Sequence, residues 1–411
     1  MKTKEILYLT YDGLTDPLGQ SQVLPYIIGL SKYNYKFSII SFEKKARFIK
    51  NKAIINAICR ENNLIWMPLF YTKRPPVFST VWDIIKLNKL SKKLHKEKKF
   101  ELIHCRSYIT SLIGLGFKKK YGTKFIFDMR GFWADERVDG LLWNIKNPLY
   151  RWVYNFFKSK EKDFLVFSDI IISLTENGKT EILSWQIPNL TKRKITVIPC
   201  AADYSLFDIN TPKKKEDAKK QIGLNNSNFV LSYIGSLGTW YMAEEMILFF
   251  SILKQKIIDA KFLLLTPDKI DILLPIINKY ELNINDFIIK FSSREKLPSF
   301  AHASDVSIFF IKPVYSKKSS SPTKLGELLA MGIPVICNNG IGDVNKIVKN
   351  KLNGICINEC NIKSFNNVLE EIDSIHKLNA NKIREESKNY YELNNNVSKY
   401  YLEYKKILEN D

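Results

Sequence analysis

The sequence lacks any grouping of the residues that bind metals or form disulfide frameworks. It has six Cys and four His in 411 residues, all scattered, and no C-x-x-C pair or Cys/His cluster has zinc spacing. This pattern argues against a zinc-binding or disulfide-stapled protein. We therefore expect reduced thiols, no structural metal and no bound cofactor. The cysteines are residues 59, 105, 200, 337, 356 and 360.

Long apolar runs are also missing. No run of 18 apolar residues occurs, so no transmembrane helix is expected. The first residues, MKTKEILYLT, lead straight into an apolar strand pattern, and we expect no signal peptide there. A chain of 411 residues is too long for one hydrophobic core, and its 45% hydrophobic content is ordinary for a globular protein. These features predict a cytoplasmic protein of two domains.

Acidic residues are scarce in the first half of the chain. Residues 1–200 contain 35 Lys and Arg against 17 Asp and Glu, a net charge of +18, whereas the remainder carries only +3 of the total of +21. A basic half beside a nearly neutral half indicates contact with something anionic: a bilayer surface, a phosphorylated substrate or nucleic acid. No nucleic-acid-binding module is recognisable, so nucleic acid is the least favoured of the three.

One segment of this basic half is rich in aromatic residues. Residues 143–163 read WNIKNPLYRWVYNFFKSKEKD. Trp, Tyr and Phe beside Lys and Arg are typical of a helix that lies on an anionic bilayer. The same pattern also fits a helix that packs its aromatic side chains into the core. The first interpretation predicts a peripheral protein on the inner face of the cell membrane.

Short apolar runs alternate with helical patterns in both halves of the chain. This alternation predicts two Rossmann-like α/β domains that face each other across a cleft, residues 1–205 and 206–392, with the site between them. The dinucleotide fingerprint G-x-G-x-x-G is absent. The expected strands are residues 5–10, 37–42, 63–69, 102–105, 124–128, 170–174, 195–199, 229–235, 261–266, 288–292, 305–311, 333–337 and 354–357.

The most informative stretch is residues 319–337, SSSPTKLGELLAMGIPVIC. Ser321 is a suitable N-cap, Pro322 suits the first helical position, and Gly332 suits the position after the helix. The amides at the start of this helix have hydroxyl groups and Lys324 close by, which predicts a phosphate or pyrophosphate site.

Glu327 is a single carboxylate on this otherwise apolar helix. A buried carboxylate needs hydrogen-bonding partners, and the two hydroxyls of a ribose would supply them. The alternative is a surface glutamate that follows an ordinary loop and cap.

Two polar loops follow expected strands in the first half. Residues 11–22, YDGLTDPLGQSQ, contain Gly19, where a ligand can approach the backbone unless this is an ordinary connecting loop. Residues 128–140, DMRGFWADERVDG, are dense in charges and aromatics at the carboxyl end of a strand, where ligands bind in open α/β sheets. This loop is either an active-site loop or an internally paired surface loop.

Five stretches in this order resemble a family-4 glycosyltransferase of the GT-B fold. They are LTYDGLTDPLGQSQ, FDMRGFWADE, VIPCAADYSLF, YIGSLGTWYM and SPTKLGELLAMGIPVI, which span nearly the whole chain. The resemblance implies transfer of a sugar from a nucleotide-sugar donor to an acceptor, with retention of configuration and without a catalytic metal. It further implies that the donor binds the second domain, the acceptor binds the first, and residues 393–411 cross back to the first.

The resemblance also assigns individual residues. Glu327 matches the second Glu of the family's E-x7-E motif, but the first falls at Ser319. Asp128 stands where the family commonly has a His at a strand end, with Arg130 close by. The Arg/Lys pair that usually holds the pyrophosphate is missing from SLGTWYM, and Lys324 or Arg294 would substitute. The catalytic candidates are Asp128, Arg130 and Ser319, and the donor-binding candidates are Gly19, Gly235, Ser236, Arg294, Ser320, Ser321, Thr323, Lys324 and Glu327.

The expected function is that of a hexosyltransferase acting on a lipid-linked glycan acceptor in surface polysaccharide biosynthesis. Its expected partners are a nucleotide-sugar, that acceptor and an anionic membrane surface. Two alternatives stay open. A non-hydrolysing nucleotide-sugar epimerase has the same two-domain plan but needs no basic first half. A non-catalytic membrane-binding protein on a degenerate transferase fold would explain Ser319 and the missing Arg/Lys pair.

Overall fold

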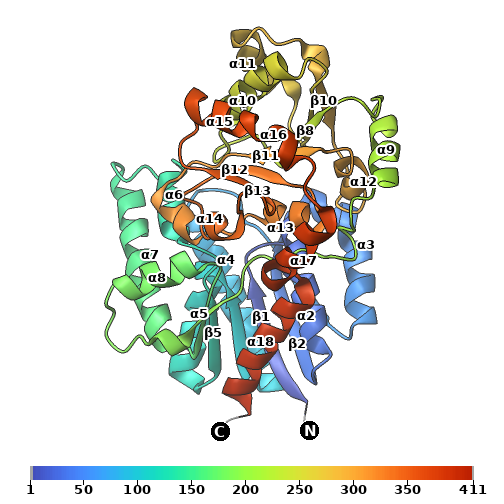
Figure 1. Ribbon diagram of the computed structural model, residues 1–411. Helices are drawn as coiled ribbons and strands as arrows, with labels where there is room; N and C mark the ends of the chain where they lie inside the picture. The colour runs from blue at the N-terminus through green and yellow to red at the C-terminus, as the bar shows by residue number, and fades with distance from the viewer. Residues whose placement is uncertain (1–2, 410–411) are drawn as a thin grey trace. The chain divides into compact units, whose positions relative to one another are not determined.

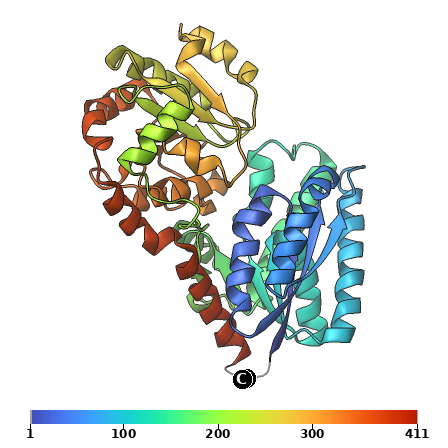
Figure 2. The same cartoon turned by 90° about the vertical axis from the view of Figure 1, so that its right-hand side faces the viewer.

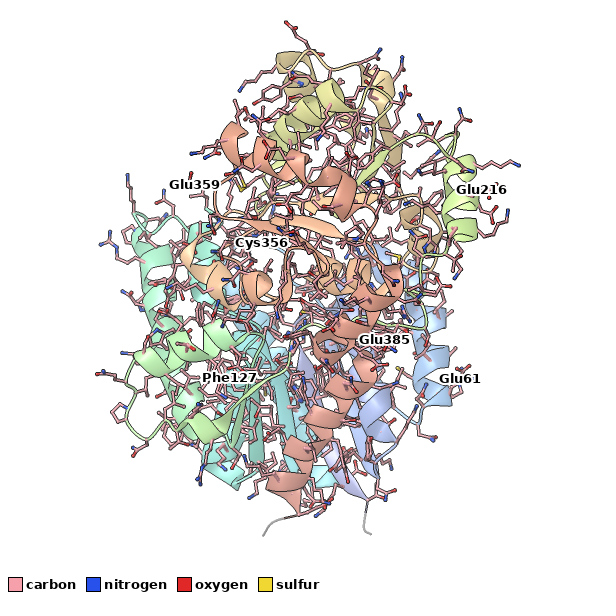
Figure 3. The ribbon with its side chains drawn as sticks, viewed as in Figure 1. Glu61, Phe127, Glu216, Cys356, Glu359 and Glu385 are labelled. Carbon is pink, nitrogen blue, oxygen red and sulfur yellow. The ribbon has the colours of Figure 1, made fainter. Side chains whose placement is uncertain are left out.

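The computed structural model describes residues 3–409, so residues 1, 2, 410 and 411 of the expected domain ranges lie outside it. The chain divides into two compact units. The first contains the residues up to Pro199 together with those from Leu393 onwards, and the second contains Cys200–Glu392. In each unit, charged side chains such as Glu61, Glu216 and Glu385 point outwards, whereas Phe127 lies inside its unit (Figure 3).

The first unit is built on a seven-stranded sheet of described residues, in the order β3-β2-β1-β4-β5-β6-β7. Every neighbouring pair is parallel, and the central strands are buried on both faces, which is why they read as nearly continuous apolar runs. The predicted doubly wound sheet is confirmed. The strands are β1 (Lys4–Thr10), β2 (Tyr35–Glu43), β3 (Ile65–Phe70), β4 (Leu102–Arg106), β5 (Lys124–Asp128), β6 (Ile170–Ser173) and β7 (Ile195–Val197).

Helices cover this sheet, and several of them, including α5, were not predicted from the sequence. Helix α5 contains Gly114, and a glycine inside a helix weakens the sequence signal. A Cβ at Gly114 would lie 2.5 Å from the ring of Phe125, so the glycine allows close packing of helix on sheet. The helices are α1 (Pro17–Gln22), α2 (Leu24–Ser31), α3 (Lys45–Glu61), α4 (Phe78–Lys98), α5 (Ser107–Tyr121), α6 (Trp133–Asp139), α7 (Pro148–Phe167) and α8 (Glu176–Ser184).

The last helix of the chain, α18 (Leu393–Leu408), belongs to this first unit. It lies along α2, as Figure 2 shows for the red and blue helices. The ring of Tyr33 stacks on that of Tyr401 at 4.0 Å, and Tyr400 and Tyr404 are buried. Helix α18 therefore places Tyr400 and Tyr404 in the interior of the first unit. The other residues of that unit precede the helix by almost 200 positions or more.

The second unit repeats the plan with a six-stranded parallel sheet in the described residues, ordered β10-β9-β8-β11-β12-β13 (Figure 1). The strands are β8 (Val230–Ile234), β9 (Lys261–Leu265), β10 (Phe287–Lys290), β11 (Val306–Phe309), β12 (Val335–Asn338) and β13 (Gly354–Ile357). The helices are α9 (Pro212–Gln221), α10 (Ala243–Lys256), α11 (Leu274–Lys279), α12 (Leu297–Ala301), α13 (Thr323–Ala330), α14 (Val344–Ile347), α15 (Ile362–Glu370), α16 (Ile372–Ile375) and α17 (Ala380–Tyr391).

The boundary between the two units lies six residues earlier in the chain than the sequence predicts. The expected boundary lies after residue 205, whereas the structure divides the chain between Pro199 and Cys200. The reason is a backbone contact within the second unit. The amide of Ala202 donates to the carbonyl of Tyr391 at 2.8 Å, and Ala202 bridges Glu392 in parallel orientation. Ala202 is therefore fixed to the end of α17.

Helix α13 carries the central motif and begins one residue later than predicted. Pro322 is the N-cap in extended conformation, and Thr323 is the first helical residue. Ser321 does not cap the helix, because its hydroxyl accepts a hydrogen bond from the amide of Cys200 at 3.2 Å. The predicted end is confirmed: Gly332 has a φ of +74° just after the helix, a conformation that glycine adopts without strain.

Helix α7 divides its aromatic residues between the core and the surface. Val153, Phe157 and Phe164 are buried, whereas Leu149 and Trp152 are exposed, Trp152 by 62%. The core-packing interpretation therefore holds for one face of this helix, while the other face meets solvent and its contact with a bilayer stays a prediction.

Candidate functional site

In the second unit, the first strand ends directly beside Lys324. Strand β8 is followed by Gly235, whose φ is +127°. A Cβ at this glycine would lie 2.7 Å from the Nζ atom of Lys324. A side chain at position 235 would therefore displace the ammonium group. The predicted donor residues Gly235 and Lys324 thus lie together.

Lys324 is buried among aromatic rings. Its side chain donates to the hydroxyl of Tyr233 at 3.1 Å, and its Nζ atom lies 3.7 Å from the ring centroid of Tyr241. Burial lowers the pKa of Lys324 well below its ordinary value, although the nearby carboxylate of Glu327 opposes this. A buried ammonium group favours binding of an anion, because the negative charge of the anion stabilises the protonated lysine.

Glu327 forms an ion pair with Arg294, so its carboxylate has a protein partner as well as any ligand. The Nη1 atom of Arg294 contacts the Oε1 atom of Glu327, and the guanidinium lies 4.9 Å from the ring of Phe207. Burial raises the pKa of Glu327, and Arg294 opposes that rise. Among the described residues, Arg294 is the one ion-pair partner of Glu327 and uses a single oxygen, so the second oxygen can accept from a hydroxyl group.

The serine residues before α13 mostly serve the local fold. The hydroxyl of Ser319 is buried and donates to the carbonyl of Ser316 at 3.2 Å. Ser320 is half-buried in the connection to α13, and its amide bonds the carbonyl of Lys317. On the other side of Gly235, Ser236 is exposed and its carbonyl accepts a hydrogen bond from Tyr233. The predicted catalytic residue Ser319 thus makes a contact of its own loop.

The sequence analysis missed a second buried lysine near this group. Lys317 is 6% exposed, and its Nζ atom lies 3.7 Å from the ring centroid of Trp240. Trp240 and Tyr241 are neighbours in the segment SLGTWYM, so two ammonium groups lie on two successive rings of it. The feature of the sequence that indicates this lysine is the pair Lys317-Lys318, which directly precedes three serines. The segment SLGTWYM has no Arg or Lys of its own, but the side chains of Lys317 and Lys324 lie against two of its rings.

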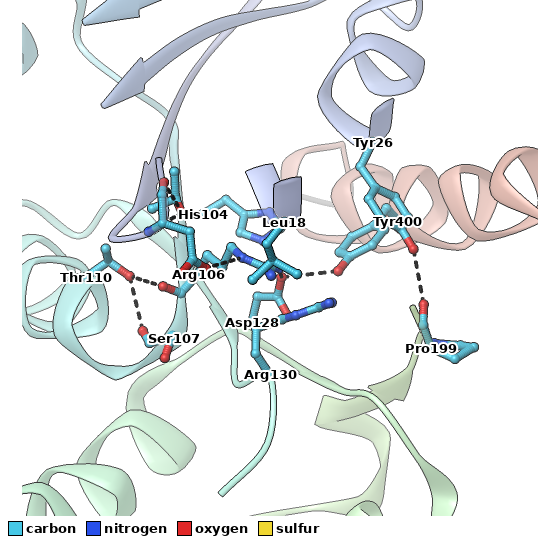
Figure 4. A network of polar contacts seen from close by, with 12 residues as sticks. Leu18, Tyr26, His104, Arg106, Ser107, Thr110, Asp128, Arg130, Pro199 and Tyr400 are labelled. Carbon is cyan, nitrogen blue, oxygen red and sulfur yellow. Dashed lines mark hydrogen bonds and ion pairs between the residues drawn. The ribbon is translucent and has the colours of Figure 1, made fainter. Parts of the chain in front are cut away.

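In the first unit, Asp128 is the centre of a buried polar cluster at the ends of β4 and β5 (Figure 4). Its Oδ2 atom lies 3.5 Å from Nε2 of His104 and accepts from the hydroxyl of Tyr400 at 3.3 Å. Its carboxylate lies 3.9 Å from Nη1 of Arg106 and 3.8 Å from Nη1 of Arg130. The predicted pair Asp128 and Arg130 is thus brought together, with three further partners.

The charges of this cluster follow from burial and pairing. Burial opposes ionisation of Asp128, but Arg130 and then His104 outweigh it, so the pKa of Asp128 lies below its ordinary value. Burial lowers the pKa of His104, so the imidazole is neutral at pH 7. Arg106 also bonds Asp12 at 3.1 Å, and the side chain of Asp12 is 41% exposed. At neutral pH two guanidinium groups therefore surround one buried carboxylate at this strand edge.

His104 and Arg106 were not proposed from the sequence. Strands β4 and β5 pair in register, with Arg106 opposite Asp128 and His104 opposite Ile126. Polar residues at the same end of adjacent parallel strands meet at one edge, and this was the available signal. The contribution of Tyr400 had no such signal, because it depends on where α18 packs.

The residues that follow both strands have unusual backbone conformations. Ser107 has a φ of +69° and Arg130 a φ of +56°, the left-handed region that residues other than glycine rarely adopt. Such conformations persist where the surroundings enforce them and are frequent at functional sites. They point to a constrained function for the ends of β4 and β5.

Gly19 lies in α1 and is buried within its own loop. A Cβ there would lie 2.0 Å from the carbonyl oxygen of Gly13 and 2.7 Å from the Cα atom of Leu14. The loop is held by Glu43, which accepts from the amides of Leu14 at 2.8 Å and Thr15 at 3.1 Å. This packing accounts for a glycine at position 19 without a ligand, so a donor contact at Gly19 stays a prediction.

Removing the charge of Asp128 should destabilise the protein strongly. We expect Asp128→Asn to lower the free energy of unfolding by about 3–5 kcal/mol, because two guanidinium groups lose their buried counter-ion. Because the pKa of Asp128 is lowered from 3.8, its contribution is present above pH 3.8 and is lost as the pH falls through the folded-state value. Urea unfolding at pH 7 measures the change.

The control for this prediction is Asp163→Asn. Asp163 pairs with Lys160 at 2.8 Å, and both side chains are about one-third exposed. An exposed pair contributes only about 0–1 kcal/mol. Equal effects of the two substitutions would contradict a central position of Asp128 in the cluster.

No group of three His, Cys, Asp or Glu side chains within residues 3–409 is arranged to hold a metal ion. The six cysteines are all reduced in the structure.

Comparison with protein families gives two matches that follow one another along the chain. The family described as "Glycosyltransferase Family 4" matches residues 30–206, and that described as "Glycosyl transferases group 1" matches residues 214–390. A comparison of the sequence with curated proteins found no match.

Solved structures of similar fold cover the whole chain. Sucrose-phosphate synthase (tll1590) from Thermosynechococcus elongatus is 13% identical with a TM-score of 0.75, over 99% of this chain and 100% of that one. Anabaena Alr3699/HepE, in complex with UDP and glucose, is 13% identical with a TM-score of 0.68, over 96% and 97%. The lipopolysaccharide outer core galactosyltransferase WaaB, in apo form, is 12% identical with a TM-score of 0.64, over 98% and 99%.

At these identities the solved structures establish the fold alone, while the two family matches establish the family. Both observations agree with the two parallel-sheet units and with the order of the motifs. The chain is therefore a glycosyltransferase of family 4, with the GT-B fold built from two Rossmann-like domains.

Proposed function

We propose that this enzyme transfers a hexose from a nucleotide-sugar to a lipid-linked glycan acceptor, with retention of configuration and without a catalytic metal, in the synthesis of a surface polysaccharide. The observation that carries the donor half is the group of Lys324, Glu327 and Arg294 in the second domain. Residues of opposite charge are buried there around the end of β8, where ligands bind in open α/β sheets.

Each member of this group has a distinct proposed role. The free oxygen of Glu327 accepts a hydrogen bond from a ribose hydroxyl, while Arg294 holds the carboxylate in place. Lys324 and Lys317 stabilise the negative charge that develops on the departing nucleoside diphosphate. Because both ammonium groups rest on aromatic rings, they are placed before the donor arrives and need little reorganisation.

The polar cluster of the first domain is proposed to position the acceptor. Arg130, beside Asp128, is the residue of this cluster that follows the strand end, and its side chain is 9% exposed. Asp128 is 1% exposed and acts through Arg130 and Arg106 rather than on the substrate directly. This differs from the direct catalytic role that the motif comparison suggests for Asp128.

The neighbours name candidate substrates. Because Anabaena Alr3699/HepE was solved with UDP and glucose, UDP-glucose is the first donor to test. The acceptor proposal has two supports: WaaB is named a lipopolysaccharide outer core galactosyltransferase, and the first domain has a basic surface with exposed aromatic residues. No helix in the described residues is long and apolar enough to cross a membrane. The basic charge and exposed aromatic residues of the first domain support our proposal of peripheral attachment to the inner face of the cell membrane.

Release of the nucleoside diphosphate from a panel of nucleotide-sugars tests the reaction. With acceptor lipids from a bacterial membrane extract, we expect release that requires both one donor and the extract, and a product whose anomeric configuration by NMR matches that of the donor. Formation of an epimerised nucleotide-sugar without the extract, and without net release of the nucleoside diphosphate, would establish the epimerase alternative. No reaction with any donor would favour the non-catalytic alternative.

Attachment to the membrane has its own test. We expect the protein to sediment with anionic vesicles at low salt and to be released at about 0.5 M salt, because screening shortens the reach of surface charges. Replacing the exposed Trp152 by Ser should reduce sedimentation, whereas replacing Tyr390, which is 41% exposed on α17, should not. Failure to sediment at low salt would rule out the attachment.

A further inference from the structure

The first domain contains an apolar pocket that the reaction described above does not use. It has a volume of about 470 Å³ and lies among α4, α5, α6 and α7. Its inner wall is formed by Ile109 and Leu112 of α5, Trp133 of α6 and Phe157 of α7. Pockets of about 300–1,000 Å³ lined mainly by apolar and aromatic side chains are typical of small-ligand sites.

The inner wall is rigid. The ring of Trp133 packs edge-on against those of Trp143 at 5.2 Å and Phe157 at 4.9 Å, and it stacks on the buried Tyr108 at 5.7 Å. Interlocked rings of this kind hold one another in place. The pocket is therefore maintained by its own walls and does not depend on an occupant to form.

The mouth of the pocket exposes large apolar side chains. Val81 is 48% exposed, Leu142 55% and Trp152 62%, and all three line the pocket. Beside them lie Phe78, 66% exposed, and Leu141, 89% exposed. An apolar surface of this density on a folded domain marks a contact with another apolar molecule.

The two segments that form most of the mouth carry only basic charges, while the carboxylate of Asp83 accepts from the hydroxyl of Tyr11 in the lining at 2.9 Å. No acidic residue occurs between Glu61 and Asp83 or between Asp139 and Glu161, the two segments that form the mouth. They contain the exposed residues Lys73, Arg74, Lys146 and Arg151. Within the pocket, the guanidinium of Arg137 lies 5.1 Å from the ring of Trp133. An occupant with an apolar chain and an anionic head would match both properties.

The pocket reaches the edge of the sheet where the polar cluster lies. Tyr11, which lines it, is the first residue after β1, and Trp133 follows Arg130 by three positions. A chain held in the pocket would therefore place its head near the ends of β4 and β5. A lipid of the bulk membrane need not place its head near these strand ends, whereas the lipid of a reacting acceptor must.

We propose that this pocket binds the hydrocarbon chain of the acceptor lipid, with the phosphate of that lipid among the basic residues at its mouth. The inference rests on the proposed function for the identity of the acceptor. It adds that the enzyme recognises the lipid itself, through a chain-length-dependent site in the first domain, and not only the sugars that the lipid carries.

Calorimetric titration of the full-length enzyme with hexyl, octyl and decyl phosphate, below their micelle concentrations, tests the pocket. We expect each added methylene to strengthen binding by up to about four-fold until the pocket is full. Leu112→Trp, which fills the inner wall, should weaken decyl phosphate binding at least about ten-fold. Val81→Trp at the exposed mouth should do the same without disturbing the core. Leu402→Trp, on the exposed face of α18, is the matched control.

The outcomes separate this proposal from the proposed function. Affinity that is independent of chain length, or equal in Leu112→Trp, Val81→Trp and the control, would overturn the pocket assignment even if nucleotide-sugar turnover is intact. Loss of vesicle sedimentation in both pocket variants with unchanged decyl phosphate binding would make the pocket a membrane contact, which also overturns it. Chain-length-dependent binding in an enzyme that uses no nucleotide-sugar would support the pocket and refute the transfer.

Discussion

Glu327→Gln should lower kcat/KM for release of the nucleoside diphosphate by about 100-fold. Glutamine keeps the shape of the side chain but loses the charge that accepts strongly from a ribose hydroxyl and pairs with Arg294. A hydrogen bond to a charged group contributes about 1.5–3 kcal/mol, which corresponds to about 10–150-fold. The loss should appear mainly as weaker donor binding, because the ribose contact is made in the ground state and the transition state alike.

The control for this substitution is Glu295, the residue that follows the partner of Glu327. Glu295 follows Arg294 directly, is exposed, and makes no ion pair within the described residues. Glu295→Gln therefore changes the net charge near the site by the same amount without touching the Arg294–Glu327 pair. Equal kinetics for the two variants, with both folded by circular dichroism, would remove Glu327 from the donor site.

Lys324→Met should have opposite effects on stability and on turnover. A methionine fills the space among Tyr233 and Tyr241 without the cost of a buried charge, so the unfolding free energy at neutral pH should rise by about 1–4 kcal/mol. Turnover should fall by about 10²–10³-fold, the effect of removing one group that stabilises developing negative charge. If Lys324 served the fold alone, replacing it would lower both the free energy of unfolding and the turnover, or neither.

The pH dependence of stability gives a second test of Lys324. Its ordinary pKa is 10.5, and burial lowers the folded-state value well below this. Between the two values the unfolded state binds more protons than the folded state, so the free energy of unfolding rises with pH across that window. Below the folded-state value both states are protonated and the penalty is constant. Lys324→Met should remove the rise.

Denaturant unfolding of both proteins from pH 7 to pH 10 measures this difference. Lys318→Met serves as the control, because Lys318 is exposed and lies beside the ring of Tyr315. It should change neither the slope nor the turnover appreciably. A Lys324→Met variant that is less stable than the wild type, or that retains full activity, would contradict the proposed role.

The sequence alone predicts the positions of the strands well because parallel strands have a strong local signal. Buried runs such as Ile170–Ser173 and Lys261–Leu265 are mostly apolar whatever surrounds them, and β–α alternation leaves few topologies. The Gly332 end of α13 is likewise local, because only a short list of residues suits a positive φ. The family resemblance rests on such short local motifs, and the family matches confirm it.

The contacts between side chains distant in the sequence could not be predicted in this way. The partner of Glu327 is Arg294, which is 33 positions away on another connection, where a ribose was expected. The position of Lys317 on Trp240 and the contact of Tyr400 with Asp128 depend on packing between elements. Ser321 illustrates the same limit, because its hydroxyl bonds Cys200 instead of capping the adjacent helix.

The most direct test of the account is the thermal midpoint of the full-length enzyme with UDP, GDP, ADP and CMP in turn. A ligand that binds only the folded state at 100 times its dissociation constant stabilises it by about 2.7 kcal/mol. We predict a clear rise in the midpoint with one nucleotide, UDP first, that is lost in Glu327→Gln and kept in Glu295→Gln. An equal rise in all three proteins, or none with any nucleotide, would contradict a donor site built on Lys324, Glu327 and Arg294.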